Sequence, residues 1–429
     1  VRTTQRTLTA YASWFSLLAA SLENVLTWRA EAPSMINNAL RQSLHSHVAR
    51  WGLKRFTSDA DYFAWQRKQL SSADLIQLRR VVERKQEGER RDEVAFYDLI
   101  AQPQILPVLY SQRYEYYLEI GSRVAARLGD AAHILDFGCG VGILTSFYAT
   151  QFPEKQFVGI DRSQASITVA REKMKGLGLG NLRFECADVE LQTISGQHDL
   201  IVATHALVQA EHDPGIPSHN WQTFERAHDT KQQALFEQRT GLDIRLDRLS
   251  ALLAQKGRMI VFEKTRQLAR RVPLQRALAA RGLDLVEQPE LVRYRLVEEE
   301  ADDGPFYLLR KEAGSTLLWE ESPEPDEGPP CDRTQFKTDV TDPDAPFYEN
   351  HWPSAQRVWE QLYDKRLLKE TTRQEPDGRQ LHVELGQAEE GVYLYCANTL
   401  DQRQVVIVEP ARACMLESYY QQIVNGASN

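Results

Sequence analysis

The chain has 429 residues, so more than one domain is expected, and its 42% apolar residues suffice for sizeable hydrophobic cores. The net charge of −9 argues against a nucleic-acid partner, because binding a polyanion draws on clustered Lys and Arg. The chain contains no run of 18 apolar residues, which argues against a membrane-spanning helix. Its five cysteines are scattered without C-x-x-C spacing, as in reduced cytosolic proteins, so we expect a cytoplasmic location.

Residues 1–130 are predicted to be almost wholly helical and to form lead-in helices and a cap over the following domain. Apolar residues recur at three- and four-residue steps between Leu8 and Leu26, which predicts an amphipathic helix. Further helices are expected over 34–51, 59–69, 72–86 and 111–128. The segment 79–91 mixes Arg and Glu at helical spacing, a pattern typical of a solvated helix face rather than of a basic patch.

A glycine-rich turn between two predicted strands is the most informative pattern in the chain. The apolar run 133–137 leads into Gly-Cys-Gly-Val-Gly at 138–142, a helix follows, and a second strand ends at Asp161. This is the pattern of a nucleoside-binding βαβ unit, in which glycine lets the backbone approach a ligand and the carboxylate accepts hydrogen bonds from ribose hydroxyls. The third glycine of a dehydrogenase fingerprint would fall on Ile143, and the chain reads Asp-x-Gly-x-Gly-x-Gly from Asp136 instead.

Downstream of this unit, short apolar runs alternate with helical stretches, which predicts a parallel sheet covered by helices. The third to seventh strands are expected near 181–188, 198–205, 256–263, 284–287 and 305–311, the last of them antiparallel. The glycines within 176–180 follow a helix and precede a strand, so they indicate the C-terminal turn of a helix rather than a second ligand-binding loop.

At these residues the sequence resembles the class I S-adenosylmethionine (SAM)-dependent methyltransferases, over roughly 105–313. The resemblance implies an α/β fold with a seven-stranded Rossmann-like core, methyl-transfer activity, and SAM as cofactor with S-adenosylhomocysteine (SAH) as product. Asp136 would orient the amino group of the methionine part, Asp161 would bind the ribose, and Asp188 would meet the adenine. The N–H groups of the glycine turn would cradle the methionine part. The implied cofactor-binding residues are Asp136, Gly138, Cys139, Gly140, Gly142, Asp161, Arg162, Asp188, Val189 and Thr204.

His205 is the candidate catalytic residue, because it follows the fourth strand, where the carboxyl edge of the sheet would face the acceptor. It could act as a general base for a protonated acceptor, or it could be a hydrogen-bonded structural residue. The family's Asn-Pro-Pro-Tyr type motif is replaced by Thr-His-Ala-Leu at 204–207, which argues against a nucleic-acid base or a glutamine amide as acceptor. Aromatic side chains are expected to line the acceptor site: Tyr110, Tyr114, Tyr117, Trp221 and Phe224.

Three histidines in the long interval after the fourth strand, His212, His219 and His228, match no ligand spacing of a metal site, so no metal is expected. Residues 314–346 are acidic and rich in proline, a composition that predicts an exposed, protease-sensitive linker.

The linker separates the predicted SAM-binding domain, 131–313, from a small α+β unit at 347–429. In that unit we expect a helix over 354–365, strands near 366–373, 380–386, 392–398 and 404–409, and a helix ending near 424.

The sequence therefore predicts a methyltransferase that acts on an oxygen or nitrogen atom, with a small molecule as the favoured acceptor. Two alternatives stay open. The C-terminal unit could recruit a protein that is then methylated, or the protein could be a non-catalytic SAM-binding scaffold whose C-terminal unit is an interaction module.

Overall fold

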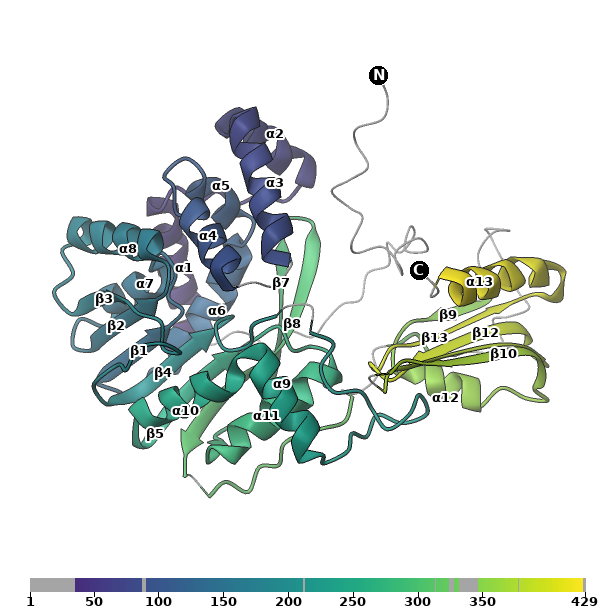
Figure 1. The fold of residues 1–429 in the computed structure, drawn as a ribbon. Coiled ribbons are helices and arrows are strands. Elements are labelled where there is room, and N and C mark those ends of the chain that lie inside the picture. Colours follow the sequence, from purple (N-terminus) through teal and green to yellow (C-terminus); the bar gives the residue numbers. More distant parts are fainter. Residues whose placement is uncertain are drawn as a thin grey trace.

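The computed structural model describes residues 35–86, 90–210, 213–312, 314–323, 328–331, 346–376 and 378–426. The amphipathic helix predicted between Leu8 and Leu26 lies outside these residues. The described chain forms a group of N-terminal helices, a large sheet with helices on both faces, and a smaller sheet near the C-terminus (Figure 1). Within the described residues, no helix combines the length and the apolar character that crossing a membrane requires.

Six helices precede the first strand in the described part of the chain. They are α1 (Met35–Arg50), α2 (Asp59–Gln69), α3 (Ser72–Gln86), α4 (Arg90–Ile100), α5 (Leu106–Ser111) and α6 (Tyr114–Ala126). α1, α2, α3 and α6 lie where helices were predicted, whereas α4 and α5 were not predicted. α1 and α6 pack together against the large sheet through apolar side chains such as Leu44, Ile120 and Val124.

The large sheet has the strand order β3-β2-β1-β4-β5-β8-β6. Its strands are β1 (His133–Phe137), β2 (Gln156–Asp161), β3 (Leu182–Cys186), β4 (His198–Thr204), β5 (Leu253–Phe262), β6 (Leu283–Leu285) and β8 (Glu299–Lys311). Neighbouring strands from β3 to β5 are parallel, and β8 runs antiparallel to β5 and β6. This topology confirms the predicted Rossmann-like core of seven strands with an antiparallel final strand.

One further strand of this sheet was not predicted. β7 (Glu290–Leu296) pairs with β8 and extends it into a hairpin that reaches toward the N-terminal helices (Figure 1). The chain turns at Val297, whose φ is 60° and whose side chain is buried among apolar residues of those helices, including Tyr62 and Leu78. The hairpin is stabilised by contacts far away in sequence, which the local pattern of apolar residues does not reveal.

Helices cover both faces of the large sheet (Figure 1). α7 (Ile143–Gln151) and α8 (Gln164–Leu177) share one core with α1 and α6, and α9 (Thr230–Thr240), α10 (Leu242–Leu252) and α11 (Leu268–Ala280) form the other. Successive residues of a strand point to opposite faces, so Ile134 belongs to the first core and Leu135 to the second. With both faces covered, a ligand can approach this sheet at its carboxyl edge.

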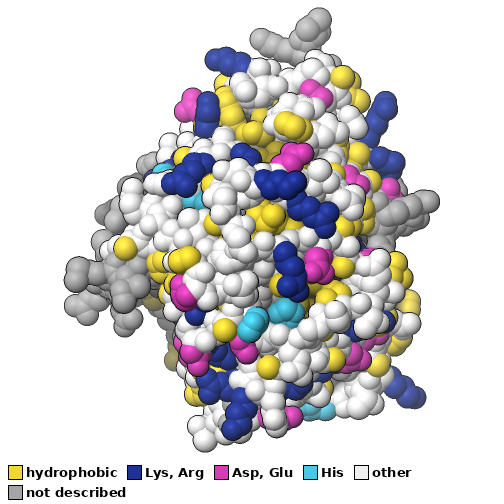
Figure 2. All heavy atoms as spheres, turned by 90° about the vertical axis from the view of Figure 1, so that its left-hand side faces the viewer, with side chains coloured by type: hydrophobic (Ala, Val, Ile, Leu, Met, Phe, Trp, Pro, Cys, Tyr) yellow, Lys and Arg dark blue, Asp and Glu magenta, His cyan; other side chains and the backbone are white. Residues whose placement is uncertain are grey.

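The surface on the β3 and α8 side of the large sheet carries charges of both signs. Figure 2 shows Lys and Arg side chains interspersed with Asp and Glu on this face. Some of them pair directly, as Arg183 and Glu185 do at 2.8 Å. Interspersed charges of this kind do not produce the single-sign field that steers a polyanion to a surface.

The smaller sheet is antiparallel, with the order β10-β11-β12-β13-β9. Its strands are β9 (Tyr348–Asn350), β10 (Arg366–Gln374), β11 (Gln380–Ala388), β12 (Gly391–Asn398) and β13 (Arg403–Val408). α12 (Ser354–Glu360) packs on one face of this sheet, against side chains such as Tyr393 and Tyr395. α13 (Ala413–Gly426) packs on the other face, against Leu394 and Cys396. The elements of this α+β unit follow the predicted order, with β9 as an addition and α12 shorter than expected.

The segment predicted as an exposed linker is packed where the structure describes its first part. In 314–323, Leu317 and Trp319 pack against the core of the large sheet. Glu321 pairs with Arg276 of α11 at 2.7 Å. The exposure predicted for this stretch therefore does not hold for Leu317 and Trp319, whose apolar side chains anchor it, whereas neighbours such as Leu318 are exposed.

Candidate active site

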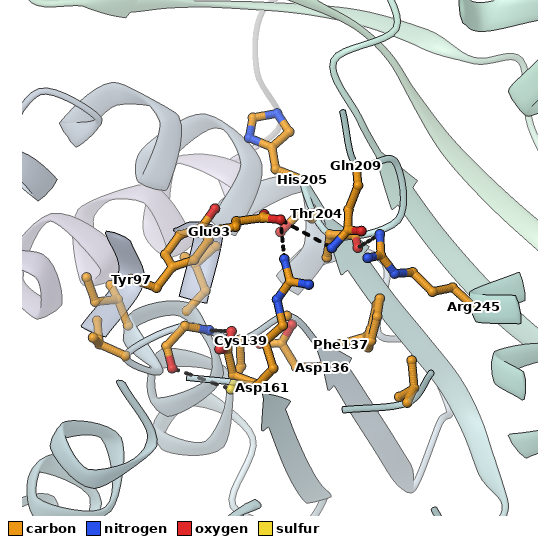
Figure 3. A pocket seen from close by; sticks show the side chains of 18 of the residues that line it. Glu93, Tyr97, Asp136, Phe137, Cys139, Asp161, Thr204, His205, Gln209 and Arg245 are labelled. Carbon is orange, nitrogen blue, oxygen red and sulfur yellow. Dashed lines mark hydrogen bonds and ion pairs between the residues drawn. The ribbon is translucent and has the colours of Figure 1, made fainter. Parts of the chain in front are cut away.

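A pocket opens at the carboxyl edge of the large sheet, where β1, β2 and β4 end (Figure 3). Its walls come from α4, α5 and α6, from the turns after the parallel strands, and from α10. The lining residues are Glu93, Tyr97, Tyr110, Arg113, Tyr116, Tyr117, Asp136, Phe137, Gly138, Cys139, Gly140, Val141, Ile143, Leu144, Asp161, Arg162, Ala187, Asp188, Val189, Glu190, Thr204, His205, Ala206, Val208, Gln209 and Arg245. Every predicted cofactor-binding residue except Gly142 is among them.

The glycine turn after β1 is folded in a way that only partly matches the prediction. Gly138, Gly140 and Gly142 all have φ between 55° and 80°, the left-handed region that favours glycine. The N–H of Gly138 donates to the carbonyl of Ile160 at 2.9 Å, and that of Gly140 donates to Asp161 Oδ2 at 2.9 Å. These two N–H groups are therefore already paired, one with the backbone of β2 and one with the Asp161 side chain, and are not free to cradle the methionine part as the resemblance implied.

The three glycines have different surroundings. A side chain at Gly138 would collide with Ala206, and one at Gly142 would collide with Phe184, so these two positions allow close packing. At Gly140 the nearest atom to a new Cβ would be Tyr110 Oη, at 3.9 Å, so this position faces open space in the pocket.

Two carboxylates of the turn region lie in different environments. Asp136 is buried at the end of β1, where Thr145 Oγ1 donates to its Oδ2 at 2.5 Å. Burial raises the pKa of Asp136 to about 7, against the effect of this hydrogen bond. Asp161 at the end of β2 accepts from the N–H groups of Gly140 at 2.9 Å and Ser163 at 2.8 Å. Burial raises its pKa too, so both carboxyl groups would gain from a cationic or hydrogen-bonding ligand.

A contact from α4 crosses the end of the pocket that Asp188 and Val189 line. Glu93 forms an ion pair with Arg162, the residue that follows β2. Gln209 Nε2 donates to Glu93 Oε2 at 3.2 Å, and Figure 3 shows Glu93 and Gln209 joined across the pocket. Glu93 was not predicted as a site residue, since it follows a run of mixed charges that indicated a solvated helix face.

Aromatic side chains and one guanidinium form the other end of the pocket. Tyr110 of α5 stacks with Tyr117 of α6, with ring centroids 6.3 Å apart. The Arg113 guanidinium lies over the Tyr116 ring, 4.2 Å from its centroid. Tyr114 points away from the pocket, and its hydroxyl lies 2.6 Å from His45 Nδ1. The prediction of Tyr114 as a pocket residue is therefore wrong, because it faces α1, and the neighbouring Tyr116 takes its place in the lining.

His205 is fixed on all sides. Its backbone has φ 54°, and its ring lies between Tyr116 and Phe262, each 5.1 Å away between centroids. Nδ1 accepts from Arg113 Nη2 at 2.5 Å, and Nε2 lies 3.1 Å from Asp303 Oδ2. Burial lowers the pKa of His205 to about 4. Nδ1 is occupied by Arg113, and Nε2 is buried against Asp303 without a hydrogen bond, so neither nitrogen is presented to the pocket as the free general base that the sequence analysis considered.

The turn that carries His205 is held from β5. The N–H of His205 donates to the carbonyl of Phe262 at 2.8 Å. The buried carboxylate of Glu263 accepts from the N–H groups of Ala206 and Leu207, each at 2.8 Å. One carboxylate therefore accepts from successive backbone N–H groups of the turn after β4. This role of Glu263 could not be predicted from the sequence, because it depends on how β4 and β5 pair.

Trp221 and Phe224 lie outside the pocket, so their prediction as walls of the acceptor site is wrong. The Trp221 ring stacks on His382 of β11, with centroids 3.6 Å apart and planes 1° from parallel. Arg403 of β13 lies over the Phe224 ring at 4.5 Å. The segment after β4 leaves the pocket beyond Gln209 and reaches the smaller sheet, which packs against these two rings instead.

Of the three histidines of this segment, His212 lies outside the described residues, and His219 and His228 line a separate surface depression beside Arg226. Among the described residues, no three His, Cys, Asp or Glu side chains gather as a metal ion would need.

Residues 134–219 match the family model described as a methyltransferase domain. Together with the strand order and the glycine turn, this match confirms that the large-sheet domain resembles the class I SAM-dependent methyltransferases.

The relatives of this methyltransferase domain resemble it over a limited part of the chain. Trans-aconitate 2-methyltransferase of Variovorax paradoxus is 35% identical over 115 residues, which is 26% of this chain and 42% of that protein. Malonyl-[acyl-carrier protein] O-methyltransferase of a Paenibacillus species is 33% identical over 89 residues, 20% of this chain and 32% of that protein. The chain thus spans less than half the length of these two relatives.

Among solved structures, the N-methyltransferase NodS from Bradyrhizobium japonicum, in complex with SAH, shares 18% identity at a TM-score of 0.31. The similarity covers 45% of this chain and 84% of NodS.

Proposed function

We propose that this protein transfers a methyl group from SAM to a small-molecule acceptor. The observation that carries the proposal is the pocket at the carboxyl edge of the large sheet, where the glycine turn, Asp161 and Asp188 come together. Nucleoside ligands bind at this edge in parallel α/β sheets. Relatives named for methylation of trans-aconitate support a small acceptor.

The polar groups of the pocket fit the charges of the cofactor. SAM carries an ammonium and a carboxylate on its methionine part, and hydroxyls on its ribose. Asp136 would hold the ammonium, Asp161 would accept from the ribose, and Asp188 with Val189 would border the adenine. Arg113 fits the carboxylate, since a guanidinium binds a carboxylate through paired N–H groups.

The contribution of the chain to methyl transfer would be alignment of the acceptor and exclusion of water. When bound, SAM supplies an electrophilic methyl group on a sulfonium sulfur. The rings of Tyr110 and Tyr117 provide aromatic groups that attract a sulfonium cation. Because Nδ1 of His205 is occupied by Arg113 and its Nε2 is buried, the site favours an acceptor that reacts without losing a proton, such as a carboxylate.

The proposal is tested with labelled SAM and a fractionated lysate. We expect label to enter small molecules, and calorimetry to give SAH binding that is weakened roughly 10- to 100-fold in Asp161→Ala, the scale of a lost hydrogen bond to a charged group. Label in protein would support the protein-methyltransferase alternative instead. Tight SAH binding without any transfer would support the scaffold alternative, and absence of SAH binding would refute all three.

A further inference from the structure

Arg113, His205 and Asp303 form a continuous chain of contacts that begins in the pocket and ends in the β7–β8 hairpin. We propose that His205 and Asp303 are positioning residues that hold Arg113 toward the carboxylate of the cofactor. The inference rests on the proposed function, since it assumes that SAM occupies the pocket. It assigns His205 a role different from general base catalysis, and it gives a function to the hairpin by which β7 and the first part of β8 extend the seven-stranded core.

Arg113 has donors to spare. A guanidinium has five N–H donors and no acceptor. Arg113 lines the pocket and uses one donor on His205 Nδ1, while its planar face rests on Tyr116. Among the described residues, no carboxylate forms an ion pair with it, and none of its nitrogens is both buried and unpaired. Its remaining N–H groups are therefore accessible from the pocket, and its charge is available to an anionic ligand.

The contact with Arg113 fixes the tautomer of His205. Because Arg can only donate, Nδ1 of His205 must accept and carries no proton. The neutral ring then bears its proton on Nε2, which lies 3.1 Å from Asp303 Oδ2. A pKa of about 4 keeps the ring neutral at physiological pH, as this tautomer requires.

Asp303 is itself held in place. The hydroxyl of Tyr294 on β7 donates to Asp303 Oδ2, and the N–H of Thr265 donates to the carbonyl of Asp303 at 2.7 Å. Burial opposes ionisation of Asp303, but His205 and Tyr294 hold its pKa below the usual range. A fixed carboxylate thus polarises the imidazole, which strengthens Nδ1 as an acceptor for Arg113.

The intervening ring also keeps Arg113 and Asp303 apart. A direct ion pair between them would occupy the guanidinium, whereas a neutral imidazole transmits orientation and leaves the positive charge unpaired. The ring cannot rotate freely, because Tyr116 and Phe262 enclose it on both faces. The arrangement therefore orients Arg113 without neutralising it.

The test compares two ligands by calorimetry on the full chain: SAH, and decarboxylated SAH, which keeps the amine but lacks the carboxylate. In His205→Phe, which preserves the stacked ring but removes both nitrogens, SAH affinity should fall roughly 10-fold, and in Arg113→Met by roughly 10- to 100-fold. The affinity for decarboxylated SAH should change by less than about twofold. The double variant should be no weaker than Arg113→Met, since His205 acts through Arg113.

Two further variants separate positioning from folding. His205→Asn offers an acceptor oxygen near the position of Nδ1 and should recover part of the lost SAH affinity. Asp303→Asn keeps the size of the side chain and should weaken SAH binding less than His205→Phe. His45→Phe is the matched control, because His45 contacts Tyr114 outside the pocket and should leave both affinities unchanged.

Equal losses for the two ligands in His205→Phe would overturn the proposal, since they would mean that the ring only shapes the pocket. Wild-type SAH affinity in His205→Phe would overturn it as well. If the wild-type protein binds neither ligand, the proposed function has failed, and that outcome is distinct from a loss confined to the variants.

Discussion

The two ends of the pocket are built in different ways. One end consists of consecutive pieces of one βαβ unit and the strand after it, from Asp136 through Asp161 to Asp188. The other end joins Arg113 and the tyrosines of α5 and α6 to His205 after β4 and Asp303 on β8. The first end is fixed by short connections that the fold always makes. The second depends on distant segments meeting, so it can differ between proteins that share the fold.

The largest loss of SAH affinity is expected when a side chain is placed in the glycine turn itself. Gly140→Val should weaken SAH binding by at least roughly 100-fold, because valine is strained at φ 55° and its side chain would enter the pocket. Calorimetry measures the affinity. Gly178→Val is the matched control, with a φ of 67° at the end of α8 and no atom within 4 Å of the new Cβ. The control should lose stability but keep SAH affinity. Equal affinity in both variants would remove Gly140 from the site.

A second variant tests which part of the segment after β4 belongs to the pocket. Trp221→Ala should lower the free energy of unfolding by about 3 kcal/mol, because it leaves a cavity where the indole packs against the smaller sheet. Its SAH affinity should stay at the wild-type value. Chemical denaturation and calorimetry measure the two quantities, and Trp352→Ala, at a more exposed tryptophan, should cost much less stability. A drop in SAH affinity without a drop in stability would return Trp221 to the pocket.

The pH dependence of SAH binding tests whether the carboxylate of Asp136 binds the ammonium group of the ligand. Its pKa of about 7 in the ligand-free protein means that it is mostly protonated at pH 6 and mostly ionised at pH 8. Only the ionised form attracts an ammonium, so SAH affinity should rise about tenfold over this range and then level off. Asp136→Asn should abolish the rise, while Asp199→Asn at an outer position should keep it.

The same raised pKa has a consequence for stability. The folded protein holds the Asp136 proton after the unfolded chain has released it, so this contribution to the free energy of unfolding is complete below the unfolded pKa and is lost as pH rises through about 7. Urea unfolding of the ligand-free protein at several pH values measures this trend. A flat difference between wild type and Asp136→Asn across these pH values would contradict it.

The smallest effect is expected at the contact from α4. Glu93→Gln should release SAH roughly two- to fivefold faster, in line with about 0.5–1 kcal/mol for a partly exposed ion pair. Stopped-flow measurements at low salt would detect the change, and high salt should shrink the difference by screening the wild-type pair. Glu185→Gln removes a comparable pair on the outer surface and should have no effect on release.

The end of the pocket built from neighbouring segments could be predicted from the sequence, whereas the end built from distant segments could not. The glycine turn and Asp161 could be placed from sequence because a strand, a turn and a helix fix their spacing. Tyr114 and Tyr116 could not be told apart, since the packing of α6 against α1 decides which of them faces the pocket. Arg113 and Asp303 left no local signal at all, because their meeting depends on the hairpin of β7 and β8. Trp221 was misplaced for a related reason: an apolar ring in a long segment can be covered by any nearby surface.

The stacking of Trp221 on His382 bears on how the protein could be divided or recombined. The segment after β4 supplies His205 and Gln209 to the pocket and then inserts an indole into the smaller sheet. Arg226 of the same segment forms an ion pair with Asp401 of the smaller sheet's last turn. A fragment cut before residue 347 would expose Trp221 and leave Arg226 without this carboxylate. The smaller sheet grafted onto another protein would in turn lack the ring that covers its face. Any exchange of this unit between proteins must therefore carry residues 216–226 with it.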